Sequence, residues 1–382
     1  MVSPLLCALV TLLSAPQHSP EGLPDKTKVQ FGSYQAELRV PPEGLFAGEE
    51  TDIEFRVTDT REKDPVEDGF KGVGAIQATA EITMPSMPGM PSAKPKVHRE
   101  GVPGDYGIEA FFPHGGAYQI KLQLKMPDGS EHVASFSVTV KDERSNTVVR
   151  LPYYLKIVGT TGWKADQERT LNLRVINSKT GLTNKAFDVA HEQRFHLLIA
   201  SKDLNWFRHE HPVMASDGTW SLPFTFPAGG DYWIYGDVAP SGEGSRVLIA
   251  KLTVAGSKPT WGTRIPMNTR ASDGGLTAVL FKTEPIEIGK STVLGVRLTS
   301  RGRPAGDTVP WLGAAGHMMI FHQDGKTVVH SHPSEDEGSH ALVKQGTIEF
   351  SARFPKAGLY KVYVQALWHG KVRTFGFGLE VK

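Results

Sequence analysis

The stretch FPAGGDY, Phe226 to Tyr232, decides the fold, because the same pattern occurs twice more in the chain. FPHGGAY begins at Phe112 and FPKAGLY begins at Phe354, and in each copy Phe and Tyr stand six residues apart around Pro and Gly. Each copy lies between two runs of alternating apolar and polar residues, which is typical of strands with one buried face. A tyrosine that enters a strand after such a corner is typical of immunoglobulin-like sandwiches.

Short alternating runs broken by Gly, Pro, Asn and Asp extend through the chain, and helical spacing of apolar residues is nowhere sustained over three turns. The 40 glycines and 26 prolines supply the many turns that such a pattern needs. One corner per segment of about a hundred residues predicts an all-β fold of three tandem immunoglobulin-like β-sandwich domains. We expect these domains near residues 28–142, 148–256 and 260–382, after a signal-peptide-like segment at residues 1–20.

The first residues indicate the compartment. An apolar run from Leu5 to Leu13 has the length of a signal-peptide core and is too short to cross a bilayer. The one cysteine, Cys7, lies inside this run. We therefore expect a periplasmic or secreted mature protein with no transmembrane anchor and no thiol, which excludes disulfides, thiolate catalysis and cysteine-bound zinc.

Charge and motifs exclude several classes of function. The chain has 42 Lys and Arg against 41 Asp and Glu, so no net basic field exists to attract nucleic acid. Motifs for a nucleophile elbow, a phosphate-binding loop, a dinucleotide fold and a helical zinc protease are missing from the sequence. No residue pattern nominates a general base, so we expect a protein that is not an enzyme.

A histidine-rich hairpin is predicted in the stretch GHMMIFHQDGKTVVHSHP, residues 316–333. Asp324-Gly325 between apolar alternations favours a two-residue type I′ turn, in which both central residues have φ above zero. With that loop, His317 lies opposite His332 and Met319 lies opposite His330. Three imidazoles and a thioether on one face form the ligand set of a small metal site: His317, Met319, His330 and His332.

A second stretch repeats the spacing H-x12-H-x-H-P. It places His196 thirteen residues before His209, with His211 and Pro212 following. Leu198 stands where the other copy has methionine, so this site would be three histidines with an open coordination position. Both hairpins have an alternative interpretation, in which the histidines are ordinary half-buried or edge residues of a sheet.

A methionine-rich loop precedes both hairpins, in AEITMPSMPGMPSAKPKVHRE. Soft thioethers favour Cu(I), whereas imidazole suits copper, zinc, nickel and iron. The mixture of methionine and histidine therefore favours copper, as Cu(I) or Cu(II), over zinc. The loop could instead be an adaptable apolar lid. The expected ligands here are Met84, Met87, Met90 and His98.

The methionine loop and the F-x-x-G-x-Y corner of domain one resemble the YtkA/FixH-like family of small extracytoplasmic β-sandwich modules. Domains two and three are similar to the histidine-rich sandwich modules that accompany such domains in secreted bacterial metal-related proteins. The resemblance implies copper handling and, in one branch of the family, assembly of cytochrome oxidase. It marks Met84, Met87, Met90 and His98 as the residues of interest in domain one.

Together these patterns predict a metal-binding protein that buffers or delivers copper, with a metal donor or acceptor protein as partner. Two other functions stay open. One is a copper or zinc enzyme that uses an open three-histidine site. The other is a cell-surface structural or adhesion array, in which the sandwiches only space a ligand surface.

Overall fold

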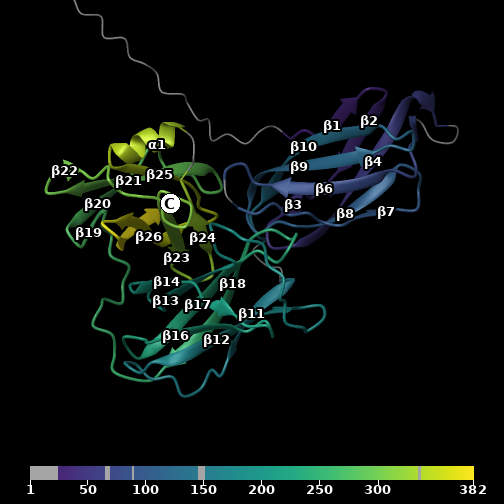
Figure 1. The fold of residues 1–382 in the computed structure, drawn as a ribbon. Helices are drawn as coiled ribbons and strands as arrows, with labels where there is room; N and C mark the ends of the chain where they lie inside the picture. The colour runs from purple at the N-terminus through teal and green to yellow at the C-terminus, as the bar shows by residue number, and fades with distance from the viewer. Residues whose placement is uncertain (1–24, 65–68, 88–89, 145–150, 334–336) are drawn as a thin grey trace, which may run out of the picture.

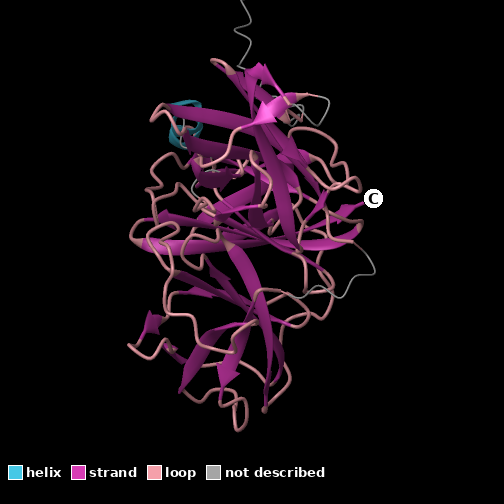
Figure 2. Cartoon of the chain, turned by 90° about the vertical axis from the view of Figure 1, so that its right-hand side faces the viewer, coloured by secondary structure: helices cyan, strands magenta, loops and turns pink. Residues whose placement is uncertain are grey.

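The computed structural model describes residues 25–64, 69–87, 90–144, 151–333 and 337–382, so the signal-like segment lies outside the described residues. The described chain is almost entirely β-structure, with one short helix (Figures 1 and 2). Its strands form six sheets that pair into three tandem sandwiches, which confirms the predicted fold class. No helix in the described part is long and apolar enough to cross a membrane.

Domain one packs two sheets around a core that includes Phe55, Phe112 and Phe136. One sheet contains, in spatial order, β1 (Lys28–Phe31), β2 (Tyr34–Arg39), β4 (Glu50–Lys63), β8 (Asp105–Phe111) and β7 (Val97–Arg99), with β5 (Phe70–Gly72) paired to β4; the other contains β3 (Leu45–Phe46), β10 (Glu131–Lys141), β9 (Gly116–Lys125) and β6 (Gln77–Thr83).

Domain two has two sheets of four strands around a core that includes Trp163, Phe226 and Tyr232. One sheet contains β11 (Tyr153–Val158), β12 (Arg169–Asn177), β16 (Trp220–Phe224) and β15 (Val213–Met214); the other contains β14 (Phe207–Glu210), β13 (Phe195–Ser201), β17 (Gly230–Val238) and β18 (Arg246–Val254).

Domain three repeats this plan and adds the helix α1 (Glu337–Lys344). One sheet contains β19 (Arg270–Asp273), β20 (Leu276–Lys282), β21 (Ser291–Ser300) and β22 (Arg303–Pro304), with β25 (Thr347–Arg353) paired to β21; the other contains β24 (Val328–Ser331), β23 (His317–His322), β26 (Gly358–Trp368) and β27 (Lys371–Val381).

The recurring Phe-to-Tyr stretch forms the same corner in all three domains. Each tyrosine hydroxyl donates to the backbone carbonyl four residues earlier: Tyr118 to His114 at 2.9 Å, Tyr232 to Ala228 at 2.8 Å and Tyr360 to Lys356 at 2.7 Å. These bonds confirm the predicted tyrosine corner.

Domains two and three pack sheet against sheet. Every residue of β13 and β23 is buried. One face of each strand packs in the core of its own sandwich, and the other face packs in the cluster shared with the neighbouring domain. Figure 1 shows the two strands where the domains meet. Burial on both faces explains why FHLLIAS and HMMIFH lack the usual polar alternation. One apolar cluster joins the two domains, and its buried members are Leu198, Ala200, Leu204, Phe207, Trp233, Tyr235, Met319, Phe321, Val328 and Tyr363.

The turn of the third-domain hairpin differs from the prediction, whereas its register agrees. Met319 pairs with His330, as expected. The loop is longer than two residues, because the His322 N–H bonds to the Thr327 carbonyl at 3.0 Å. Gly325 has a φ of 67°, but Asp324 is not among the residues with positive φ, so the turn is not type I′. The Asp324 carboxylate instead accepts the N–H groups of Lys326 and Thr327, which stabilises the wider loop.

Candidate metal centre between domains two and three

Six histidines from the two hairpins gather into two groups of three. In each group every residue offers one ring nitrogen, and these nitrogens lie within 4.8 Å of one another. The registers Leu198 to His209 and Met319 to His330 are equivalent, so both hairpins present their histidines in the same way. The first group is His196, His209 and His211, and the second is His317, His330 and His332.

The third-domain group leaves three buried ring nitrogens without a hydrogen bond. His317 uses Nε2 to donate to the Trp311 carbonyl at 2.8 Å, and His330 uses Nδ1 to donate to Asp237 Oδ2 at 2.7 Å. Among the described residues, no partner meets His317 Nδ1, His330 Nε2 or His332 Nε2. A buried polar atom without a hydrogen-bond partner lowers the stability of a folded protein by about 1–3 kcal/mol. Three such atoms side by side are rare in a native protein and indicate a ligand-binding site.

The second-domain group brings nitrogen lone pairs together. His196 Nε2 donates to the Ala190 carbonyl at 2.9 Å, and His209 Nδ1 donates to Gln365 Oε1 at 2.9 Å. These partners leave His196 Nδ1 and His209 Nε2 unprotonated, yet the two atoms lie 3.1 Å apart. His211 Nε2 is 3.3 Å from His196 Nδ1. An ion about 2.0–2.1 Å from each nitrogen would hold the nitrogens at about this separation.

The two groups are linked by reciprocal contacts. His196 of β13 lies opposite Asp237 of the neighbouring strand β17. In the same way, His317 of β23 lies opposite Gln365 of β26. Asp237 bonds His330 of the other domain, while Gln365 bonds His209 of the other domain. Such an exchange is typical of an isologous interface, in which two equivalent surfaces meet around a two-fold axis.

The family comparisons agree with this internal repeat. The family model described as "Domain of unknown function (DUF8832)" matches residues 153–256 and again residues 270–382. The chain belongs to the DUF8832 family. A second model, "YtkA-like", matches residues 28–123, so domain one is YtkA-like, as predicted. The two DUF8832 repeats correspond to domains two and three, and each carries one trihistidine group.

Other comparisons are distant. No curated protein matches the chain. Among solved structures, the tetra-tandem repeat of the extending region of a large adhesion protein is 10% identical, with a TM-score of 0.20, and the match covers 88% of this chain and 71% of that chain. The chicken CNTN1 FN1–FN3 domains are 10% identical, with a TM-score of 0.18, over 90% of this chain and 98% of that chain. None of these likenesses bears on function.

Burial lowers the pKa of five of the six hairpin histidines, which favours their neutral form. Desolvation, followed by the nearby charge of His196, lowers the pKa of His211 to about 4. Desolvation, followed by the nearby charge of His330, lowers the pKa of His196 to about 4. The same causes lower the pKa of His209, His317 and His332 well below the ordinary value. Neutral imidazole is the form that binds a metal ion.

Asp237 is the half-buried carboxylate of the centre. Desolvation alone would raise its pKa, but the hydrogen bond and charge of His330 outweigh that effect and lower the pKa of Asp237 below its usual value. The carboxylate is therefore ionised at neutral pH and orients the His330 ring.

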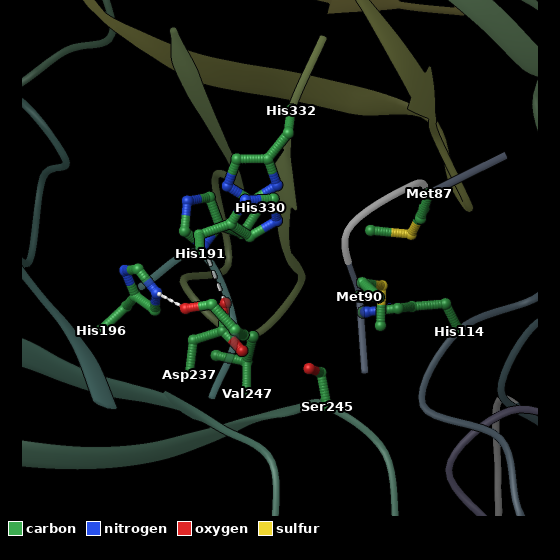
Figure 3. A pocket seen from close by; sticks show the side chains of 11 residues that line it. Met87, Met90, His114, His191, His196, Asp237, Ser245, Val247, His330 and His332 are labelled. Atoms are coloured by element: carbon green, nitrogen blue, oxygen red, sulfur yellow. Dashed lines mark hydrogen bonds and ion pairs between the residues drawn. The ribbon is translucent and has the colours of Figure 1, made fainter. Parts of the chain in front are cut away.

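Domain one reaches the same centre. A cavity of about 20 Å³ is lined on one side by histidines of the DUF8832 repeats and on the other by Met87, Met90 and His114 (Figure 3). That volume has room for about one water molecule or a metal ion. Backbone contacts connect the domains nearby, because the Lys94 N–H bonds to the Gly242 carbonyl at 2.6 Å.

The methionine loop and His98 lie in different places. Met84 is 9% exposed and belongs to the domain-one core, whereas Met87 and Met90 line the cavity. His98 lies 2.6 Å from Glu100 and 3.7 Å from Asp52, and it is not among the residues that line the cavity. Of the four expected ligands of domain one, Met87 and Met90 therefore lie at the cavity, whereas Met84 and His98 do not. Metal binding by any of the four stays a prediction.

Met319 is fully buried in the apolar cluster between the two repeats. It lies on the strand that carries His317 and directly opposite His330. Its place in the register agrees with the sequence, and ligation by its sulfur stays a prediction. Leu198 occupies the equivalent place in the first repeat and packs in the same cluster.

Four residues of the centre are not found by the hairpin pattern: His114, His191, Asp237 and Gln365. His114 is part of the tyrosine-corner stretch, which masks its place beside the cavity. Asp237 and Gln365 act across the domain boundary, which no spacing within one repeat can reveal. His191 stands five residues before His196 and is the one of the four with a local signal, since it adds a histidine to the segment.

Proposed function

We propose that this protein is an extracytoplasmic copper-binding protein that holds copper at the two trihistidine groups of its DUF8832 repeats and buffers or delivers it. The observation that carries the proposal is the set of three buried, unpartnered nitrogens on His317, His330 and His332. A cation bound by this group would satisfy all three at once. A second cation, bound by the other group, would offset the repulsion between the facing lone pairs of His196 and His209.

Copper is favoured over zinc by the side chains around the centre. Imidazole ligands suit both ions, but thioethers select copper, and Met87 and Met90 line the cavity next to the histidines. Domain one is YtkA-like, and the resemblance to that family implies copper handling. The proposed ligands are the six hairpin histidines, with Met87 and Met90 as additional soft ligands. Copper would arrive from a donor protein, or leave to an acceptor protein, on the side of these methionines.

Buffering or delivery accounts for the form of the site better than catalysis on an organic substrate. The cavity of about 20 Å³ has room for an ion and not for a substrate. Asp237 is the carboxylate of the cavity lining, and it is already bonded to His330. Two similar sites in one chain suit storage or transfer, because each adds capacity without adding a new reaction.

The test of metal identity is a competition titration of the full chain with Cu(I), Cu(II) and Zn(II), followed by X-ray absorption at the copper edge. We expect copper to displace zinc and the absorption spectrum to show imidazole nitrogens as the main ligands. Zinc that resists displacement by copper would contradict the choice of metal. A protein that binds neither ion would contradict the proposed function and favour the structural or adhesion array.

A second candidate function is a metal-dependent oxidase. The two groups are adjacent, since the rings of His196 and His330 lie 5.3 Å apart and those of His209 and His317 lie 5.9 Å apart. Two neighbouring copper ions with open positions can react with oxygen. An oxygen-uptake assay distinguishes the oxidase from the buffering protein. It compares the copper-loaded protein in ascorbate with the same concentration of free copper. Buffering predicts slower uptake than free copper, and an oxidase predicts faster uptake.

A further inference from the structure

The two trihistidine groups have different hydrogen-bond partners at equivalent positions. Asp237 and Gln365 each stand opposite the first histidine of their own repeat. Each one crosses the interface and accepts a hydrogen bond from the second histidine of the other repeat, at 2.7 Å for Asp237 with His330 and at 2.9 Å for Gln365 with His209. The geometry is matched, but one acceptor is a carboxylate and the other is a neutral amide.

Both acceptors are largely shielded from water. The Gln365 side chain is buried, and its Nε2 donates to Thr374 Oγ1 at 3.0 Å, which leaves Oε1 to face His209. The Asp237 side chain is 16% exposed and the His330 side chain 3% exposed, so little water screens this pair. Both histidines therefore present Nε2 to their sites, and the sites differ by one negative charge directly behind a ligand.

That charge changes the affinity for a cation. A carboxylate that accepts from a metal-bound imidazole makes the ring a stronger donor, and in a poorly hydrated interior it also offsets part of the charge of the ion. The benefit grows with the charge of the ion, so a divalent ion gains more than a monovalent one. A neutral amide orients the ring equally well without this gain.

An independent asymmetry lies at the turns that precede the first histidines. Residues 190–193 and residues 311–314 form equivalent turns, closed by the bridges Ala190 to Gln193 and Trp311 to Ala314. The first turn carries His191, whereas the second carries Leu312 at the same place.

The His191 ring reaches across to the third-domain group and stacks on His332, with ring centroids 3.4 Å apart. Its Nε2 is buried and has no hydrogen-bond partner within the described residues. His191 has a φ of 45° and Leu312 has a φ of 52°, so the two turns share a left-handed residue at this place and differ in its side chain. The first turn places an extra imidazole beside His332, while the apolar Leu312 offers no ligand in return.

We propose that the two sites are unequal: the group His317, His330 and His332 is the tighter site for a divalent ion, while the group His196, His209 and His211 is an uncharged site that prefers Cu(I). This inference rests on the proposed function. Asp237 acts as a positioning residue through His330, and His191 packs an additional imidazole ring against His332 of the same site. A chain with one site of each kind could hold copper in both oxidation states.

The experiment is a Cu(II) titration of the full chain against a competing chelator, repeated with Cu(I) in a reducing, oxygen-free buffer. We expect two Cu(II) affinities in the unchanged protein. Asp237→Asn should weaken the tighter Cu(II) affinity by about 10–100-fold and change Cu(I) binding less. Gln365→Glu is the matched reciprocal variant, and it should strengthen the weaker Cu(II) site. The paired exchange, Asp237→Asn with Gln365→Glu, should reverse the order of the sites.

Two further variants assign and control the result. Asp237→Glu keeps the charge and should restore most of the Cu(II) affinity, which a purely structural role of Asp237 would not predict. His191→Leu copies the second repeat and should alter the Cu(II) electron paramagnetic resonance spectrum. Thermal unfolding verifies that each variant is folded.

The outcomes separate this inference from the proposed function. If the unchanged protein binds two Cu(II) ions equally and Asp237→Asn alters neither affinity, the inequality is refuted while copper binding stands. If the unchanged protein binds no copper in either oxidation state, both the inequality and the proposed function are refuted.

Discussion

At the residue scale, the centre depends on what the second nitrogen of each histidine does. His196 and His317 each give Nε2 to a backbone carbonyl six residues earlier, so Nδ1 faces the site. His209 and His330 each give Nδ1 to a side chain of the other repeat, so Nε2 faces the site. The partner of one nitrogen thereby decides which nitrogen is free to bind.

Two tyrosine hydroxyls should stabilise the interface equally. Tyr235 donates to the Gly325 carbonyl at 2.9 Å and Tyr363 donates to the Leu204 carbonyl at 2.8 Å, both buried between the repeats. Tyr→Phe at either position leaves a carbonyl unpartnered and should lower the free energy of unfolding by about 1–2 kcal/mol. Urea denaturation measures this, with the exposed Tyr154→Phe as control; losses no larger than the control would contradict the account.

Asp324 should make stability depend on pH. Burial alone would raise its pKa, but the bonds from the Lys356 ammonium and the Lys326 N–H outweigh that effect and lower the pKa to about 2. A carboxyl with a depressed pKa stabilises the fold above its unfolded pKa of about 4 and loses that contribution as the pH falls toward 2. Asp324→Asn should therefore cost about 1–2 kcal/mol at pH 7 and progressively less below pH 4. Urea denaturation of the unchanged protein and of Asp324→Asn across this pH range measures the difference in unfolding free energy. An equal difference at pH 7 and at pH 3 would contradict this role of Asp324.

At the element scale, the hairpins β13–β14 and β23–β24 carry the histidines in one register because the inner strands β13 and β23 are buried on both faces. A slip of one residue would turn the histidines into the sandwich core and the core residues toward the other domain. The apolar side chains between histidines, such as Leu198 and Phe321, fill the interface cluster and fix the register. The candidate ligands and the interface packing therefore share the same strand face.

Gly325 should be required at the tip of the second hairpin. A Cβ there would lie 2.2 Å from the Trp233 ring, and its φ of 67° disfavours any side chain. Gly325→Ala should cost about 2–4 kcal/mol, from backbone strain and overpacking together. Gly370→Ala is the matched control, because Gly370 has a φ of 72° but nothing within 4 Å of the added Cβ, and it should cost about 1 kcal/mol. Equal costs in thermal unfolding would show that the contact with Trp233 does not matter.

Much of each element can be predicted from local sequence. The Phe-to-Tyr corner predicts the sandwich and its tyrosine bond, and the spacing of His317 and His330 predicts a shared face, since strand alternation is a local property. The Asp-Gly pattern does not predict the wide turn at Asp324. The Asp324 carboxylate accepts the N–H groups of Lys326 and Thr327, and a two-residue type I′ turn would not use these bonds. The bond from His330 to Asp237 is beyond local sequence altogether, because its geometry exists only after two domains have docked.

At the scale of the whole molecule, the two repeats form one structural unit. Their shared cluster buries side chains such as Leu198, Met319 and Phe321 completely, and each buried side chain of this kind contributes about 1.5–3 kcal/mol. Hydrogen bonds between the repeats, such as those from His330 to Asp237 and from His209 to Gln365, fix how the two packed surfaces are oriented. Domain one is tied to the same unit by Arg353, whose guanidinium lies 2.9 Å from Asp142.

Copper should stabilise the two repeats together. An ion that binds only the folded state adds about 2.7 kcal/mol per site when its free concentration is 100 times its dissociation constant. Calorimetry with copper and with excess chelator should therefore show one cooperative transition of domains two and three that moves to higher temperature with copper. A transition that does not move while copper is bound would mean that the ions sit outside this interface.

The most direct test of the central claim is the copper content of the folded protein and of two triple variants, measured by elemental analysis after removal of free metal. One variant carries His317→Ala, His330→Ala and His332→Ala, and the other carries His196→Ala, His209→Ala and His211→Ala. The control carries His132→Ala, His340→Ala and His369→Ala, three histidines outside the centre. We predict that each site variant loses about one copper equivalent and that the control loses none. Equal copper in all four proteins, or none in the unchanged protein, would contradict the account.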